Sequence, residues 1–506
     1  MPTSAHNTLS SYLIPLAVGL LCGILFVFSL GNLPFKWTFA ILLGVIGVGG
    51  LVFLNILQLQ TKHMILMLAV YLMPILYDIN FMYDENPGFY VHANGFGVAI
   101  TDVLFGMLIV AWLLQITVGK RGNLPDSTFP LEWKIVMAGL FVVNFVSAVN
   151  TAEPFFAYSM IWQQIKVYFI IVFLAKTIND IQVVKRIGYI MVAVLGTQAI
   201  ILFEQKLVGA IFTDQLLGQR TTWQNEGGPL RVSGTLGQPN ACAMFMNQLM
   251  MVGVFIGLAE KKFGLKVLIL GAVAMAAAAE IFTASRGGWS GLAISFVTCM
   301  ILWRIRQGHG FVASVALVSL IGSLMFSGLF MGSEAFRNRL TQDDKGTSDV
   351  RAPLMEVAKN LIADNPLTGV GLNHYTYDMQ KYDRTFVAIT RDWSAPVHNT
   401  FMLIAGEIGI PATIFPVLMI WFTMYTSIRL FFKADGTISA MSLGIFGGVL
   451  SWVIHNQVDP TSIYAEYPFW IMSGMVIAMQ RMHRAQEREK LRSAAEEKAA
   501  AVNTVT

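Results

Sequence analysis

Long runs of apolar residues recur along almost the whole chain. Each run holds roughly 17 to 25 residues, the length that an α-helix needs to cross the hydrocarbon core of a bilayer. Hydrophobic residues make up 55% and charged residues 13% of the 506 positions, far from the balance of a soluble protein. Because the runs are too many and too evenly spread for a simple anchor, we predict an all-α, polytopic integral membrane protein.

These runs predict about 14 membrane-spanning helices. They lie near residues 12–30, 37–57, 63–79, 99–118, 132–149, 155–176, 187–205, 240–258, 266–283, 288–304, 311–331, 400–430, 437–455 and 465–481. Residues 1–11 contain no Lys or Arg, which argues against a signal peptide, so we expect the first run to stay as a helix. We treat residues 1–506 as a single membrane domain, in which residues 1–230 carry no motif that we can match.

The cysteines and the net charge exclude some classes of function. Cys22, Cys242 and Cys299 all lie inside apolar runs, where packing is a better interpretation than a disulfide or a thiolate metal site. The net charge of +4 gives no reason to expect nucleic acid as a partner. The sequence also lacks a Walker A motif, a dinucleotide-binding glycine pattern and a His-Glu-x-x-His helix. A nucleotide-driven pump and an intramembrane zinc protease are therefore disfavoured.

One long polar segment, residues 332–398, interrupts the apolar pattern and ends in Val397-His398-Asn399-Thr400. Residues 350–363 within it have helical spacing, which places Arg351 near the start of a helix that Asn365-Pro366 ends. We expect this loop to carry a site that membrane helices hold in place. Its basic residues are Arg337, Arg339, Lys345, Arg351, Lys359, Lys381, Arg384 and Arg391.

The distribution of Lys and Arg predicts the orientation of the chain. Counted over alternate loops, these residues are in excess on the side that holds the N-terminus, which is therefore expected to be cytoplasmic. The tail at 481–506 is expected to form a charged helix on that side, near anionic lipid. The polar segment 332–398 then faces the periplasm. Short loops on the same outer side, near 79–98, 150–154 and 456–464, contain no Lys or Arg.

Two polar clusters lie before membrane spans on the predicted outer side. In the first, Arg231 precedes Ser, Thr and Asn residues at a helix start, which could hold an anion or could form a plain helix cap. In the second, Ser285-Arg286-Gly287-Gly288 separates two apolar runs, either as a place where backbone approaches a ligand or as a hairpin with a harmless cation. Glu280, in the preceding span, is a natural partner for a nearby cation.

Further polar residues lie at or within later spans. His398 and Asn399 stand at the top of a span that also carries Glu407, and a neutral imidazole there could accept a proton, although a lone His is also common at an interface. His455 and Asp459 form a similar, weaker pair. Lys166 falls in mid-span and should face a polar cavity, where it could bind phosphate or pair with Glu280.

In this order, the clusters resemble the O-antigen ligase and polymerase family of bacterial envelope glycosyltransferases. The recognisable part runs from about Arg231 to Asp459. The similarity rests on Arg231-x-Ser-Gly-Thr with Pro239-Asn240, Ser-Arg-Gly-Gly at 285–288, Asn-Pro-Leu-x-Gly-Val-Gly-Leu at 365–372, His-Asn-Thr-Phe at 398–401 and Glu-Ile-Gly-Ile-Pro at 407–411.

The resemblance implies a GT-C-like membrane fold and a metal-independent, inverting glycosyl transfer at the periplasmic face of the bacterial inner membrane. The donor would be a glycan on undecaprenyl diphosphate, the acceptor a hydroxyl of lipid A-core or of another glycan, and no cofactor is implied. Arg231 and Arg286, with Arg351 third, would stabilise the diphosphate. His398 would act as general base, and Glu407 would orient His398 or a neighbouring arginine. Other candidate substrate-binding residues are Ser285, Lys166, Asn399, Glu280 and His455.

Several alternatives remain open from the sequence. A polysaccharide polymerase and a protein O-oligosaccharyltransferase would run the same chemistry on other acceptors. A lipid-linked glycan flippase also needs many spans with buried charges, but the polar groups here cluster outside the expected midplane. A structural membrane subunit is the simplest alternative, and it predicts that Arg286, Arg351 and His398 matter only for stability.

The orientation predicts the result of a fusion experiment. A reporter that is active only in the periplasm, fused after Asp343, should be active, because the loop that holds Asp343 is expected on that side. The same reporter fused after Arg306 should be inactive. Activity at Arg306 without activity at Asp343 would reverse the predicted topology.

Overall fold

The computed structural model describes residues 59–75, 78–84, 88–117, 129–149, 151–217, 221–223, 230–341 and 347–503. The expected spans 12–30 and 37–57, together with Cys22 and Lys345, lie outside the described residues. The chain divides into two compact units, Met1–Met82 with Phe96–Asp126, and Tyr83–Gly95 with Ser127–Thr506.

The first unit, in its described part, holds two helices and a small sheet. The helices are α3 (Leu59–Tyr71) and α4 (Ile100–Thr117), and strand β1 (Asp78–Phe81) pairs antiparallel with β2 (Phe96–Ala99), so that Asp78 lies opposite Ala99. The prediction of one helix over 63–79 is wrong beyond Tyr71. Pro74 follows that residue, and a proline cannot continue a helical hydrogen-bond ladder.

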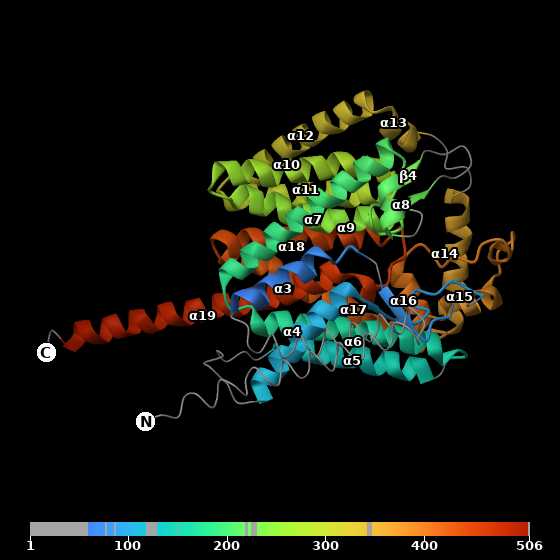
Figure 1. Ribbon diagram of the computed structural model, residues 1–506, viewed down its shortest axis with the longest axis horizontal. Helices are drawn as coiled ribbons and strands as arrows, with labels where there is room; N and C mark the ends of the chain where they lie inside the picture. Colours follow the sequence, from blue (N-terminus) through green and yellow to red (C-terminus); the bar gives the residue numbers. More distant parts are fainter. Residues whose placement is uncertain are drawn as a thin grey trace, which may run out of the picture. The chain divides into compact units, whose positions relative to one another are not determined.

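The second unit is built from long apolar helices (Figure 1). Nine helices in the described part of the chain are long and apolar enough to cross a membrane, and this confirms the prediction of a polytopic, all-α membrane protein. They are α5 (Leu131–Val149), α6 (Pro154–Thr177), α7 (Ile181–Leu207), α9 (Pro239–Ala259), α10 (Phe263–Glu280) with the 3-10 turn η1 (Ile281–Thr283), α11 (Arg286–Arg306), α12 (Phe311–Gly332), α17 (Ile410–Lys433) and α18 (Gly436–His455).

Shorter elements gather at one end of this bundle, while the last part of α19 (Tyr467–Asn503) leaves from the other end (Figure 1). The helical continuation of α19 past Arg481 confirms that the charged tail is a helix. The short elements are α8 (Ile211–Leu217), β3 (Thr222–Trp223), β4 (Arg231–Val232), α13 (Glu334–Thr341), α14 (Thr347–Asp364), α15 (Tyr375–Asp378), η2 (Met379–Tyr382), η3 (Ile389–Arg391), α16 (Thr400–Ile408) and η4 (Ile463–Ala465).

The centre of the second unit is the contact between α9 and α18. Helix α9 is buried along most of its length, and small residues let the two backbones approach closely. A methyl group added at Gly444 would lie 2.7 Å from Val252 Cα, and one at Gly448 would lie 2.7 Å from the carbonyl oxygen of Gln248. Cys242 and Cys299 are free and buried here, as packing residues.

Two arginines bind helix ends away from the short elements. Arg481 of α19 donates hydrogen bonds to the carbonyls of Lys176 and Ile178, at the C-terminal end of α6. Arg306 of α11 forms an ion pair of 2.9 Å with Asp435, just after α17. Cations are favourable at helix C-termini, where carbonyl groups lack partners.

The span expected over 400–430 is two helices, and the prediction of a single helix is wrong there. Helix α16 ends at Ile408, Gly409 takes a left-handed φ of 86°, and α17 begins at Ile410. A side chain at Gly409 would collide with the carbonyl of Leu367 at 2.2 Å. The backbone N–H of Ile410 donates instead to Pro366 O at 2.9 Å. The break therefore gives the polar loop a place to dock.

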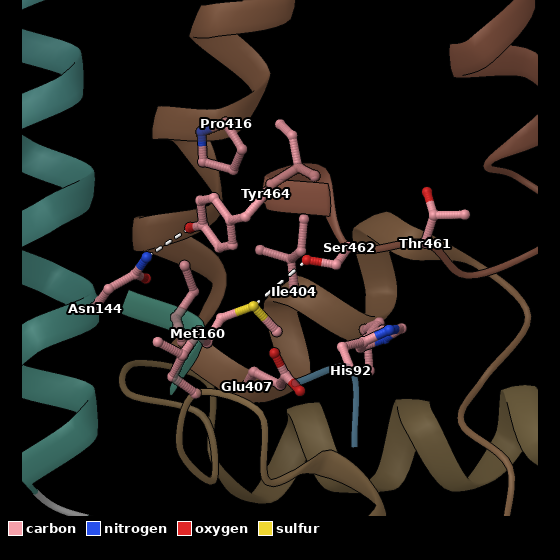
Figure 2. A pocket seen from close by; sticks show the side chains of 13 residues that line it. His92, Asn144, Met160, Ile404, Glu407, Pro416, Thr461, Ser462 and Tyr464 are labelled. Atoms are coloured by element: carbon pink, nitrogen blue, oxygen red, sulfur yellow. Dashed lines mark hydrogen bonds between the residues drawn. The ribbon is translucent and has the colours of Figure 1, made fainter. Parts of the chain in front are cut away.

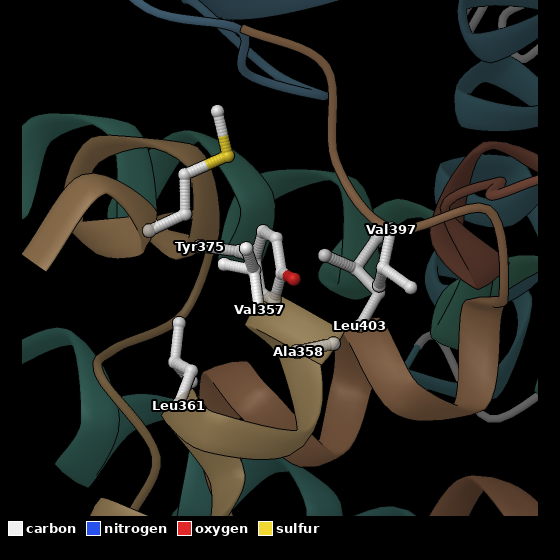
Figure 3. Packing of buried hydrophobic residues seen from close by; sticks show 7 residues of the cluster. Val357, Ala358, Leu361, Tyr375, Val397 and Leu403 are labelled. Carbon is white, nitrogen blue, oxygen red and sulfur yellow. The ribbon is translucent and has the colours of Figure 1, made fainter. Parts of the chain in front are cut away.

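An apolar cluster joins helix α14 of the polar loop to the short helix α16, which precedes α17 (Figure 3). Helix α14, predicted over 350–363, occupies Thr347–Asp364, and its buried face packs against residues before and within α16. The cluster fixes α14, which carries Arg351, relative to the segment that carries His398. Its members are Val357, Ala358, Leu361, Tyr375, Met379, Val397 and Leu403.

The close approach of α9 and α18 makes a testable prediction. Gly444→Ala should destabilise the protein, because the new methyl group overlaps backbone atoms of α9 that cannot move aside, at a cost of about 1–3 kcal/mol. Gly322→Ala in α12 is the matched control, since open space surrounds that position. Thermal unfolding in detergent measures both variants. A Gly444→Ala melting temperature equal to that of the control would contradict the packing.

Candidate functional site

The site is organised around the break between α10 and α11. Ala284 has a left-handed φ of 50°, and Ser285 caps α11 by accepting a hydrogen bond from Gly288 N at 3.2 Å. The turn leaves two successive carbonyls for side chains to bind. Arg231 Nε donates to Thr283 O at 2.8 Å, and Arg339 Nε donates to Ala284 O at 3.1 Å.

Four arginines, Arg231, Arg286, Arg339 and Arg351, come together at this break, from β4, α11, α13 and α14. Burial, and then the positive charge of Arg339, lower the pKa of Arg231 to about 10. Arg351 and Arg286 act in the same direction, which places all four guanidinium groups within electrostatic reach of one another. The sequence analysis proposed Arg231, Arg286 and Arg351 as site residues, whereas it named Arg339 only among the basic residues of the polar loop.

Asp459 is a carboxylate that faces this cluster. Burial raises its pKa to about 6, while a hydrogen bond from Asn240 and the charges of Arg351 and Arg231 oppose the shift. Arg231 also donates to Asn240 Oδ1 at 2.7 Å, so Asn240 links the arginine to the acid. Asp459 is the acid that acts on Arg231 among the described residues, and one acid cannot neutralise four guanidinium groups. The arrangement is therefore suited to an anion with several oxygens, such as a diphosphate.

Arg351 keeps its hydrogen-bonding capacity. Its Nε is buried without a hydrogen-bond partner in the described part of the chain. A buried donor without a partner is costly, and such groups are found where a ligand completes the site. The free Nε of Arg351 is compatible with the ligand-binding role that the sequence suggested.

His398 lies within electrostatic reach of Arg351 and directly before the N-cap of α16. Burial, and then the charge of Arg351, lower its pKa to about 4, so the imidazole is neutral at pH 7. Its Nδ1 is buried and makes no hydrogen bond to any described residue. A neutral imidazole with a ring nitrogen that needs a partner can accept a proton from a bound hydroxyl.

The segments that carry His398 and Asp459 are joined by hydrogen bonds. Asn399 caps α16 by accepting from Met402 N at 3.0 Å, and its Nδ2 donates to Gln457 Oε1 at 3.2 Å. Thr400 Oγ1 donates to Asn456 Oδ1 at 2.5 Å. Asn399 therefore fixes the loop after α18 against the start of α16.

His455 and Ser285 also meet. Their Nε2 and Oγ atoms lie 3.5 Å apart, and a methyl group at Gly287 would come within 2.8 Å of the imidazole. The glycine after Arg286 is thus required by the close approach of α18. Glu280, buried beneath the turn, has an oxygen with no hydrogen-bond partner among the described residues.

Lys166 and Glu407 come from other elements than the four arginines, namely α6 and α16. Lys166 lies on α6, which packs mainly on α5 and α19, whereas Glu280 ends α10, which packs on α7 and α9. No described contact joins the two side chains. The carboxylate of Glu407 accepts backbone hydrogen bonds from Asn373 and Tyr375, and so holds the glycine turn of the polar loop. No described contact joins Glu407 to His398 or to an arginine.

A small cavity lies beside Glu407 (Figure 2). Its volume is about 30 Å³, too small for a sugar ring, so it is not the substrate site. Asn144 donates to the Tyr464 hydroxyl across it, and His92 Nε2 reaches it without a hydrogen-bond partner among the described residues. The sequence missed His92 and Tyr464, which lie in short connections without a motif. Within the described ranges, no group of three His, Cys, Asp or Glu side chains could hold a metal ion.

The electrostatics of His398 predict a shifted titration. Histidine-selective NMR, assigned with His398→Gln, should show a midpoint near pH 4, well below the ordinary value of 6.5. Arg351→Gln removes a positive charge that disfavours the imidazolium, so the midpoint should rise. Arg351→Lys keeps the charge and should leave the midpoint near that of the native protein. A native midpoint near 6.5 would contradict the claim that burial and Arg351 lower the pKa of His398.

Comparison with known proteins bears on this arrangement. Residues 270–417 match the family model described as O-Antigen ligase. The match includes Arg286, Arg351 and His398, while Arg231 and Asp459 lie on either side of it. No curated protein matches the chain. The family match confirms the resemblance found in the sequence: residues 270–417 are similar to the O-antigen ligase family.

Proposed function

We propose that this protein transfers a glycan from undecaprenyl diphosphate to an acceptor hydroxyl at the periplasmic face of the bacterial inner membrane, with lipid A-core as the first candidate acceptor. The observation that carries the proposal is the convergence of Arg231, Arg286, Arg339 and Arg351 beside His398, at one end of a membrane bundle. An anion site next to a neutral base is what glycosyl transfer from a diphosphate requires.

The arginines act on the leaving group. In the reaction, the bond between the anomeric carbon and the phosphate oxygen breaks, and its electron pair stays on the diphosphate. Negative charge therefore grows there in the transition state. Arg231 is already held by Thr283 O and Asn240 Oδ1, so it need not reorganise as that charge develops. Preorganised donors of this kind stabilise a transition state without the aid of a metal ion.

His398 acts on the acceptor. The acceptor oxygen attacks the anomeric carbon from the side opposite the diphosphate, and its proton passes to the imidazole. A single displacement of this kind inverts the anomeric configuration. Arg351 serves both halves of the reaction, because it offers a donor to the diphosphate and its charge keeps the nearby imidazole unprotonated before the attack.

The position of the site supports an enzyme over a flippase. A flippase that works by alternating access needs its polar groups near the bilayer midplane, between rocking halves. Here the arginines come from helix ends and from α13 and α14, at one end of the bundle (Figure 1). A polymerase and a protein O-oligosaccharyltransferase would use the same residues with another hydroxyl. We propose no metal and no cofactor.

The central prediction concerns His398. In proteoliposomes with a lipid-linked glycan donor and lipid A-core, His398→Ala should lower the rate of transfer by about 100-fold or more, the usual effect of losing a general base. Donor binding should be nearly unchanged. His309→Ala is the matched control and should transfer at the native rate, because this exposed histidine follows the end of α11 opposite to Arg286.

Other outcomes would decide among the alternatives. Near-native transfer by His398→Ala would show that the His398 imidazole is not the general base. Movement of the lipid-linked glycan across the bilayer, without glycan appearing on any acceptor, would indicate a flippase. Native transfer by a variant that lacks Arg286, Arg351 and His398 together would leave only a structural role for the cluster.

A further inference from the structure

Aromatic side chains pack helix α13 against the first turn of α11. Phe336 is buried, and its ring centroid lies 4.7 Å from that of Trp289, at an interplanar angle of 38°. Phe326 of α12 meets Phe336 edge to face at 5.9 Å. Because Trp289 follows Arg286 by one helical turn, this contact holds α13 beside the start of α11.

The same face of α13 carries Arg339. Residues three apart on a helix are neighbours, so Phe336 and Arg339 point to one side, toward α11. Arg339 Nε donates to Ala284 O at 3.1 Å, next to the carbonyl of Thr283 that Arg231 Nε binds. Two arginines from distant parts of the sequence are therefore fixed on successive carbonyls, each through its Nε.

The surroundings of Arg339 are positive. Burial, and then the charges of Arg286 and Arg351, lower its pKa, so its guanidinium shares the field of the cluster. Like charges gathered in this way are unfavourable without an anion among them. Arg337, two residues earlier on α13, makes no described contact with the cluster.

We propose that Arg339 is a fourth residue that binds the donor's diphosphate. Helix α13, which packs through Phe336 on Trp289, positions Arg339 for this contact. The inference rests on the proposed function. As the bond to the sugar breaks, the diphosphate gains a further negative charge. A fourth guanidinium gives more stabilisation to that form than to the intact donor, so it assists the reaction and also holds the product lipid.

Binding of undecaprenyl diphosphate alone to the purified full chain in nanodiscs tests the proposal. Arg339→Gln should weaken binding by about tenfold or more, as expected for loss of a charge-assisted hydrogen bond. Arg337→Gln removes the same charge from the same helix and should bind as the native protein does. Arg339→Lys, which keeps the charge without the planar fork, should lie between them.

Two further variants separate the possible failures. Phe336→Ala should weaken binding although Arg339 remains, because α13 loses the aromatic contact with Trp289 that holds it against α11. Arg231→Gln reports on the proposed function itself. If Arg231→Gln weakens binding while Arg339→Gln does not, the role of Arg339 is overturned and the proposed function stands. If neither Arg231→Gln nor Arg339→Gln weakens binding, the role of Arg339 and the proposed function are both overturned. An equal loss in Arg337→Gln and Arg339→Gln would reduce the effect to general charge and would overturn the specific role.

Discussion

Mutual repulsion among four guanidinium groups is the constraint on which the rest of the site depends. Two unit charges at 4 Å repel by about 4 kcal/mol under the effective screening of a protein surface, so the cluster must be held by other bonds. Backbone carbonyls provide them: Thr283 O binds Arg231, and Ala284 O binds Arg339. The left-handed Ala284 exposes these carbonyls, and Asp459 compensates part of the charge. The remaining positive potential is available to an anionic substrate.

Interruptions of the membrane helices determine where this potential is placed. The turn at 281–285 separates α10 from α11, and Gly409 separates α16 from α17. Each break frees backbone groups that helical bonds would otherwise occupy, and each receives a distant segment: Arg231 and Arg339 at the first, the Pro366 turn at the second. Irregular backbone of this kind is tolerated in membrane proteins where protein covers it. The site is thus built from helix ends rather than from helix faces.

The sequence predicted the features that depend on local pattern. The length of the apolar runs located the long helices, and the helical spacing of Leu354, Val357 and Leu361 located α14. Both signals come from residues that are close to one another in the sequence. Arg339 and the break at Gly409 could not be found in this way. Arg339 depends on Phe336 meeting Trp289 some 47 residues earlier in the chain, and the break depends on Pro366 reaching α17. Such contacts leave no period in the sequence.

The apolar cluster beneath α14 explains how the two halves of the site keep a common geometry. Val357 and Leu361 on α14 pack with Val397 and Leu403 on either side of His398, so Arg351 and the imidazole are carried by one packed body. Close-packed cores resist small displacements, and this fixes the electrostatic influence of Arg351 on His398. A loop that was merely tethered at its ends could bind an anion, but it would not bury the imidazole, and burial is the larger cause of the lowered pKa of His398. The packing of the loop is therefore part of the chemistry that we propose for the site.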